Sequence, residues 1–115
     1  MFTLQAALNY ASTLHNLQHF KEAKALMRKT IPVAQRVFGE SHELTLKMRW
    51  IYAEAHYKDS DATLADLREA VNTLEDSARG ARRVYGGQHP IVAGFEYHIE
   101  KSRAALAARE TPGSP

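Results

Sequence analysis

The sequence predicts an all-α fold of antiparallel helix pairs, made of two helix-turn-helix repeats and a C-terminal capping helix. Three observations support this prediction. The octapeptide RVFGESHE at residues 36–43 returns 47 positions later as RVYGGQHP. Apolar residues recur at steps of three and four in five segments, as in amphipathic helices. A glycine follows each segment that precedes the repeated loop, where helices commonly end. A repeat of this length predicts stacked helical units that form an extended binding surface.

The first four segments form two repeat units, and the fifth is a final single helix. The first helix is expected at residues 2–17 and the second at 20–38, ended by Gly39. The third is expected at 44–57, where the polar stretch 58–61 interrupts it. The fourth is expected at 63–85, capped by Asp61 or Thr63 and ended by Gly86. The fifth is expected at 90–109, because Pro90 suits a first helical position.

These helices define the expected domain organisation. A repeat domain would occupy residues 1–109, with repeat 1 at about 2–39, repeat 2 at about 44–86 and the capping helix at about 90–109. Residues 110–115 are expected to form a disordered tail. The second and fourth helices align at a shift of 47 residues, and the first and third align better at 42. The difference predicts a longer loop before the fourth helix.

Composition excludes several classes of function. The 115 residues include no cysteine, which excludes disulfides and thiolate metal sites and fits a reducing, cytoplasmic compartment. The formal net charge of +2 is too small to predict a nucleic-acid partner. No apolar run approaches the ~18 residues of a membrane span. We therefore expect a protein or peptide partner.

No motif predicts an enzyme or a cofactor. His15 and His19 have a spacing that can bind zinc from one helix face, but His19 lies at a predicted turn, so we predict no metal site. Gly86 and Gly87 end a helix and lack the Gly-Lys-Ser/Thr of a phosphate-binding loop. Arginines gather at the end of the fourth helix, where the helix dipole favours cations. They either form a solvated face or meet an anionic partner. These are Arg79, Arg82 and Arg83.

The loop residues Gly86-Gly87-Gln88-His89-Pro90 resemble the Gly-x-x-His-Pro loop of the tetratricopeptide repeats found in kinesin light chains. The earlier copy, residues 39–43, has Glu43 in place of the proline. The small-residue contacts of that family fall on Ala11, Ala23, Ala53 and Ala70. The resemblance covers residues 2–105 and implies a right-handed superhelical solenoid. It also implies a non-catalytic protein–protein interaction module.

The same resemblance implies that the first, third and fifth helices line a concave groove that binds partners. Asn9 matches an asparagine that holds a peptide backbone in such repeats. Trp50 is the single tryptophan, and it is either a binding hot spot or a packing residue between helices. The predicted partner-binding residues are Gln5, Asn9, Ser12, Asn16, Lys47, Trp50, Glu54, Lys58, Tyr97 and Lys101.

Both ends of the array lead to further expectations. The fifth helix has Glu100 where the alignment expects a small alanine, so we expect this helix to cap the array. The sequence enters the first helix within a few residues of Met1, so we expect either a piece of a longer array or an open face covered by another subunit. Apolar surface near Leu4 and Leu8 is therefore expected to seek a partner. This gives the alternative function, in which the chain is a structural subunit that forms a homodimer or joins a larger assembly.

Overall fold

The computed structural model describes residues 3–110, which form five α-helices and, within that range, no β-strand. They are α1 (Leu4–Asn16), α2 (Phe20–Phe38), α3 (Glu43–Tyr57), α4 (Leu64–Tyr85) and α5 (Pro90–Glu110). The bounds lie within one or two residues of the predicted segments, apart from Phe2, which lies outside the described residues. α5 continues through Glu110, so the helix includes the first residue of the predicted tail. The rest of that tail is not described.

The two glycine loops repeat the same local geometry. Gly39 and Gly86 follow α2 and α4 with φ values of 92° and 86°. Residues with a side chain rarely adopt this conformation, and glycine adopts it at little cost. The N–H of each glycine donates to a carbonyl four residues earlier, at 2.9 Å. Both helices therefore end where the sequence pattern predicts.

The histidines of the same two loops start the following helices. The Nδ1 atom of His42 accepts a hydrogen bond from the N–H of Leu44, and that of His89 accepts one from the N–H of Ile91, both at 3.1 Å. Each imidazole thus satisfies an N–H that has no partner inside the helix. The repeated loop is therefore a helix stop followed by a helix start.

The longer loop before α4 ends in a capping box. The Thr63 hydroxyl accepts from the N–H of Asp66 at 3.1 Å, and the Asp66 carboxylate accepts from the N–H of Thr63 at 3.0 Å. Of the two predicted caps, Thr63 is the one used. The loop is also fixed to the first repeat, because Lys24 Nζ lies 3.1 Å from the carboxylate of Asp59 in a nearly buried ion pair.

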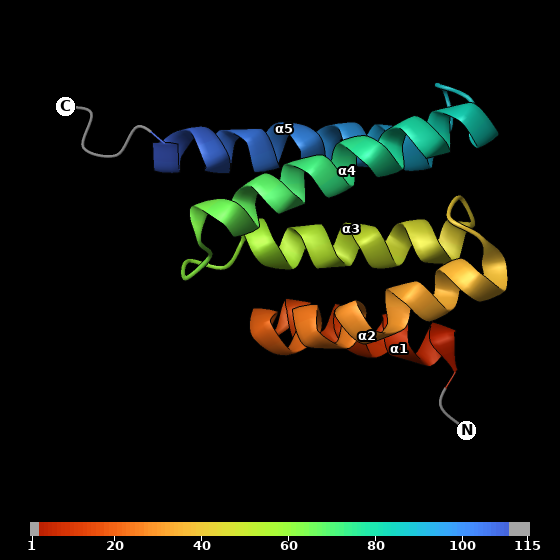
Figure 1. Cartoon of the computed structure of the whole chain (residues 1–115), viewed down its shortest axis with the longest axis horizontal. Helices are drawn as coiled ribbons and strands as arrows, with labels where there is room; N and C mark the ends of the chain where they lie inside the picture. Colours follow the sequence, from red (N-terminus) through yellow and green to blue (C-terminus); the bar gives the residue numbers. More distant parts are fainter. Residues whose placement is uncertain (1–2, 111–115) are drawn as a thin grey trace.

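Helix α3 lies at the centre of the molecule. It contacts the other four helices, with the α1–α2 pair on one side and the α4–α5 pair on the other (Figure 1). One hydrophobic core lies among α1, α2 and α3, and another lies among α3, α4 and α5. All four alanines predicted as helix contacts have no solvent-exposed surface. Their small side chains allow the helices to approach closely. These are Ala11, Ala23, Ala53 and Ala70.

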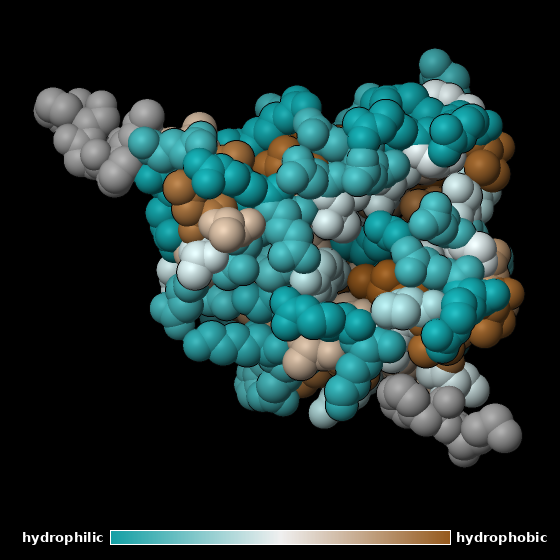
Figure 2. All heavy atoms as spheres, viewed as in Figure 1, coloured by the Kyte–Doolittle hydropathy of each residue, from teal (hydrophilic) through white to brown (hydrophobic). Residues whose placement is uncertain are grey.

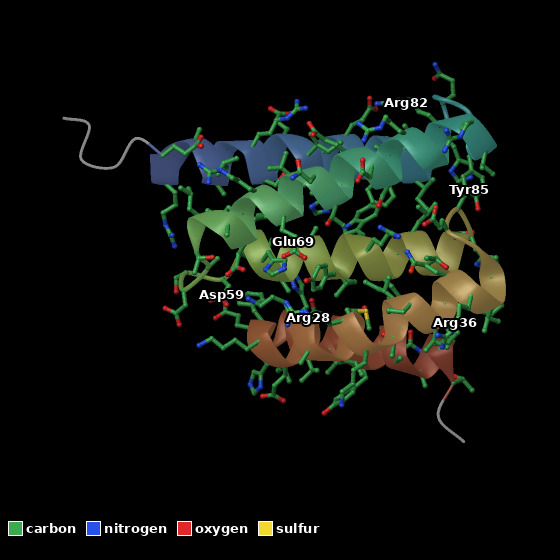
Figure 3. All side chains as sticks on the ribbon, in the orientation of Figure 1. Arg28, Arg36, Asp59, Glu69, Arg82 and Tyr85 are labelled. Carbon is green, nitrogen blue, oxygen red and sulfur yellow. The ribbon has the colours of Figure 1, made fainter. Side chains whose placement is uncertain are left out.

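A polar bridge joins α2, α3 and α4 on the side seen in the figures. Arg28 Nη2 donates to the Tyr52 hydroxyl at 3.1 Å, and this hydroxyl donates to Glu69 at 2.6 Å. Figure 3 shows Arg28 and Glu69 directed toward one another from α2 and α4. Burial and the hydrogen bond to Glu69 raise the pKa of Tyr52. The face seen in Figure 2 is mostly hydrophilic, with apolar residues in small patches.

Helix α5 buries one side only. Phe95 is completely buried and Ile99 is nearly so, which places the predicted apolar stripe in the second core. Glu100 is exposed to solvent. α5 therefore covers the end of the second repeat with one side and exposes Glu100 on the other.

Candidate interaction surface

The first helices of the units, α1, α3 and α5, are neighbours, because α3 contacts both of the others. We call the surface formed by their predicted partner-binding side chains the A-helix face. Most of these side chains are at least partly exposed, and Glu54 is the one that is buried. The face contains Gln5, Asn9, Ser12, Asn16, Lys47, Trp50, Glu54, Lys58, Tyr97 and Lys101.

A pocket of about 340 Å³ lies on the A-helix face between α1 and α3. Five of the predicted partner-binding residues line it, together with Leu8 and Ile51. These five are Gln5, Asn9, Ser12, Lys47 and Trp50. They come from two helices that are distant in sequence, so the structure brings together residues that the repeat alignment had placed at corresponding positions.

The polar side of this pocket is organised by α1. Gln5 Nε2 donates to Asn9 Oδ1 at 3.1 Å, one helical turn away. This contact uses one of the two acceptor positions of the Asn9 oxygen, and the Asn9 NH₂ group makes no hydrogen bond to another described residue. Lys47 reaches the carboxylate of Glu43 at 3.1 Å, and both of these side chains are about half exposed. An exposed pair of this kind is weak, so Lys47 remains available to a partner.

Trp50 packs between helices, and part of its ring also borders the pocket. Its ring lies 5.3 Å from the ring of Phe95 and 4.7 Å from that of His98, between centroids, so it packs on α5. It also lines the pocket. The indole rests on Gly94, where an added Cβ would lie only 2.0 Å from Trp50 Cη2. Gly94 therefore makes room for the indole between α3 and α5.

Glu54 lies at the centre of a buried ionic cluster that joins α1, α3 and α5. Its carboxylate lies 3.4 Å from His15 Nε2, 2.8 Å from Lys58 Nζ and 3.8 Å from His98 Nε2. The other nitrogen of His98 shares a hydrogen bond with the Tyr57 hydroxyl. Because His98 Nε2 faces a carboxylate, Nδ1 is the atom that accepts the hydrogen bond donated by the Tyr57 hydroxyl. One carboxylate thus links all three helices of the A-helix face.

The electrostatics of this cluster keep the carboxylate ionised. Burial opposes ionisation of Glu54, but its interactions with His15 and Lys58 outweigh burial and lower the pKa of Glu54 to about 2. Burial also lowers the pKa of His98, against the opposing effect of Glu54. At neutral pH the cluster therefore contains a charged carboxylate and a neutral His98. Glu54, which was predicted to contact a partner, is 8% exposed, and its contacts run to His15, Lys58 and His98.

The remaining predicted residues extend the face beyond the pocket. Tyr97 is 57% exposed, and Lys101 Nζ lies 5.4 Å from the centre of its ring in a cation–π contact. The Tyr97 ring also contacts His98, which links it to Trp50 through a row of three rings. Asn16 is exposed at the last residue of α1. These residues lie outside the pocket between α1 and α3.

Sequence reasoning missed several residues of this site. His98, Tyr57 and Ile51 were not predicted, and His15 was weighed only as a metal ligand. The alignment contained a signal for His98. Shifts of 42 and 47 residues place Asn9, Ile51 and His98 at the same position of successive helices. Nothing in the sequence indicated that Glu54 would meet both imidazoles.

The two leucines predicted to seek a partner lie at the first core. Leu8 is only 7% exposed and belongs to the first core, and Leu4 packs against that core. They are held inside the chain by α2 and α3, so Leu8 leaves little surface for self-association. The exposed apolar side chains of α1 are instead Tyr10 and, just after the helix, Leu17.

The structure also bears on metal binding and on membrane crossing. Among the described residues, no group of three or more His, Cys, Asp or Glu side chains is placed to hold a metal ion. His19 Nδ1 lies 3.2 Å from the carboxylate of Glu22. None of the described helices combines the length and the apolar character that a membrane crossing requires.

Comparison with known families gives one match. Residues 3–43 match the family model described as Tetratricopeptide repeat. Searches of curated proteins and of solved structures gave no match. The matched region contains α1, α2 and the first glycine loop. The second loop repeats the glycine end and the histidine cap of the first, and α3 and α4 repeat the buried alanines of α1 and α2. The long loop type of kinesin light chains is consistent with this family model. The chain thus contains a tetratricopeptide repeat at residues 3–43.

Proposed function

We propose that this chain is a non-catalytic protein–protein interaction module that binds an extended segment of a partner on the A-helix face. Tetratricopeptide repeats generally mediate protein–protein interactions, and the repeat is a non-catalytic element. The observation that supports this face is the pocket between α1 and α3, which five of the ten predicted residues line. The proposed site of action is the cytoplasm, in keeping with the absence of cysteine.

The proposed binding mode follows from the side chains of the pocket. An extended peptide exposes N–H and C=O groups along its length, and the amides of Gln5 and Asn9 offer both donors and acceptors to it. Trp50 offers a rigid apolar surface to a side chain of the peptide. Lys47 and Lys58 contribute to specificity at the rim. Glu54 acts indirectly, because it fixes the spacing of the three helices through His15 and His98.

The test is a peptide selected by display on the purified chain and then measured by isothermal titration against matched variants. Asn9→Ala and Lys47→Ala should each weaken binding by about tenfold, as for a contact residue worth ~1.4 kcal/mol. Asn72→Ala on α4 and Lys29→Ala on α2 remove the same side chains from exposed positions off the A-helix face and should change little. If Asn72→Ala and Lys29→Ala weaken binding as much as Asn9→Ala and Lys47→Ala do, the proposal is wrong.

The alternative, self-association through α1, is supported by the exposure of Tyr10 (52%) and Leu17 (61%). Light scattering on a sizing column should compare the wild type with a Tyr10→Glu/Leu17→Glu variant. A dimer that this variant abolishes would favour the structural role. A Leu8→Glu variant would be uninformative, because it places a carboxylate in the core.

A further inference from the structure

A second pocket, of about 290 Å³, lies away from the A-helix face, where the loop before α3 meets α3 and α4. Its lining includes Ser41 from the loop, Arg49 from α3, and Ser77, Gly80 and Arg83 from α4. None of the predicted partner-binding residues lines it. The Tyr85 hydroxyl holds the loop in place by donating to the carbonyl of Ser41 at 2.9 Å, and Figure 3 shows Tyr85 at the end of α4 beside this loop.

Arg49 places a largely buried guanidinium beside this pocket. Its side chain is 21% exposed, and its ion-pair partner Glu40 is 3.9 Å away with a side chain that is 79% exposed. A contact of this length to a solvated carboxylate compensates little of the cost of burying a cation. Arg49 therefore has unused capacity for an anion.

Ser41 and Arg83 both approach Gly80, the glycine that lines the pocket. A Cβ built on Gly80 would lie 3.3 Å from Ser41 Oγ and 3.9 Å from Arg83 Nη2. The absence of a side chain at Gly80 thus leaves space between a hydroxyl and a guanidinium. Asp76, the other carboxylate of the lining, is engaged by Arg79. In the part of the chain that the structure describes, no carboxylate pairs with Arg83.

Ser77 provides an independent indication of a ligand. Ser77 is 5% exposed, and its hydroxyl is buried with no hydrogen-bond partner among residues 3–110. Buried hydroxyls normally have a partner, and an unpaired one calls for an explanation. Ser77 also lines the pocket. A ligand with acceptor oxygens would satisfy this hydroxyl.

We propose that this pocket binds a phosphate-type oxyanion between Arg49 and Arg83, with Ser77 and Ser41 as hydroxyl donors. A phosphate monoester combines a charge near −2 with three strong acceptor oxygens, which matches two guanidinium groups and two hydroxyls. A carboxylate, with two oxygens and one charge, would leave donors unused. The volume corresponds to about ten waters, enough for a phosphate and the first atoms of its ester.

The test is an NMR titration of the whole chain, labelled with ¹⁵N, with inorganic phosphate and separately with O-phospho-L-serine, at constant ionic strength. The arginine Nε–H and Ser77 amide signals should shift and saturate. Arg83→Gln should weaken binding about tenfold or more, as expected for a lost charged hydrogen bond. Ser77→Ala should weaken binding without changing the charge of the pocket.

The control is Arg36→Gln, which removes the same charge from the corresponding last turn of α2, at an exposed position away from this pocket. It should leave both affinities unchanged. Tighter binding of O-phospho-L-serine would identify a phosphorylated side chain as the source of the anion, and equal binding would identify the free anion. Chemical shift changes that do not saturate would overturn the proposal. So would a loss of affinity in Arg36→Gln equal to that in Arg83→Gln.

Discussion

Gly94→Ala tests whether the indole of Trp50 is seated between α3 and α5. In an ordinary helix interior, replacing glycine by alanine stabilises by ~1 kcal/mol. At Gly94 the new methyl group would lie 2.0 Å from Trp50 Cη2 and 2.4 Å from Cζ3, whereas carbon atoms pack at about 3.5–4.0 Å. The indole must therefore retreat by about 1.5 Å, against its contact with Phe95.

Gly94→Ala is expected to lower the free energy of unfolding, whereas glycine to alanine in an ordinary helix interior raises it. Overpacking of a fitted site costs ~1–3 kcal/mol, which exceeds the helix gain and leaves a net destabilisation of about 1 kcal/mol. Thermal denaturation followed by circular dichroism should show a melting temperature lower by about 4 °C. Because Trp50 is the single tryptophan, its emission should also shift as the ring becomes more exposed.

Two controls separate the clash from the helix effect. Gly80→Ala lies in α4, where the nearest atom to the new methyl group is Ser41 Oγ at 3.3 Å, so it should be neutral or stabilising. In a Trp50→Phe background, Gly94→Ala should regain the usual stabilisation. The reasoning is refuted if Gly94→Ala stabilises the wild type as much as Gly80→Ala does and leaves the emission unchanged.

Three other variants test single contacts. Because the pKa of Glu54 is lowered from 4.5 to about 2, its stabilisation is complete above pH 4.5 and is lost as pH falls toward 2. Urea denaturation should show that the free energy of unfolding of the wild type falls over that pH range by up to about 3 kcal/mol more than that of Glu54→Gln. If the two proteins lose stability equally as pH falls, the prediction is wrong. His89→Ala should cost ~1 kcal/mol in thermal melts by removing the cap of α5, whereas His19→Ala, which removes no cap bond, should cost less than about half as much. Tyr52→Phe should cost about 1–2 kcal/mol in chemical denaturation by breaking the bridge between α2 and α4, and an equal loss in Tyr10→Phe would argue against the bridge.

The predicted helices and loops came close to the structure because their causes are local. Apolar residues at steps of three and four lie on one side of a helix whatever the rest of the fold does. Gly39 and Gly86 end helices through their own backbone conformation, and His42 and His89 cap residues only two positions away. The alanine contacts were also predictable, because the repeat alignment placed them at corresponding positions.

The candidate site was only partly predictable. The alignment grouped the residues of the α1–α3 pocket, since they share a helical register. It did not reveal that Glu54 would be buried between His15 and His98, because these residues come from three helices and are separated by about forty positions each way. The same reason explains Leu8, which local pattern placed at an open end and tertiary packing buried against α3.

The sequence by itself determined five helices, their caps and the order of the repeats, because those features depend on interactions within about four residues of the chain. Only the tertiary structure decided which side chains meet across helices. It seated Trp50 on Gly94, joined three helices at Glu54, and placed Arg49, Arg83 and Ser77 around one pocket. These contacts depend on the angle and depth at which helices pack, and no spacing along the chain encodes them directly.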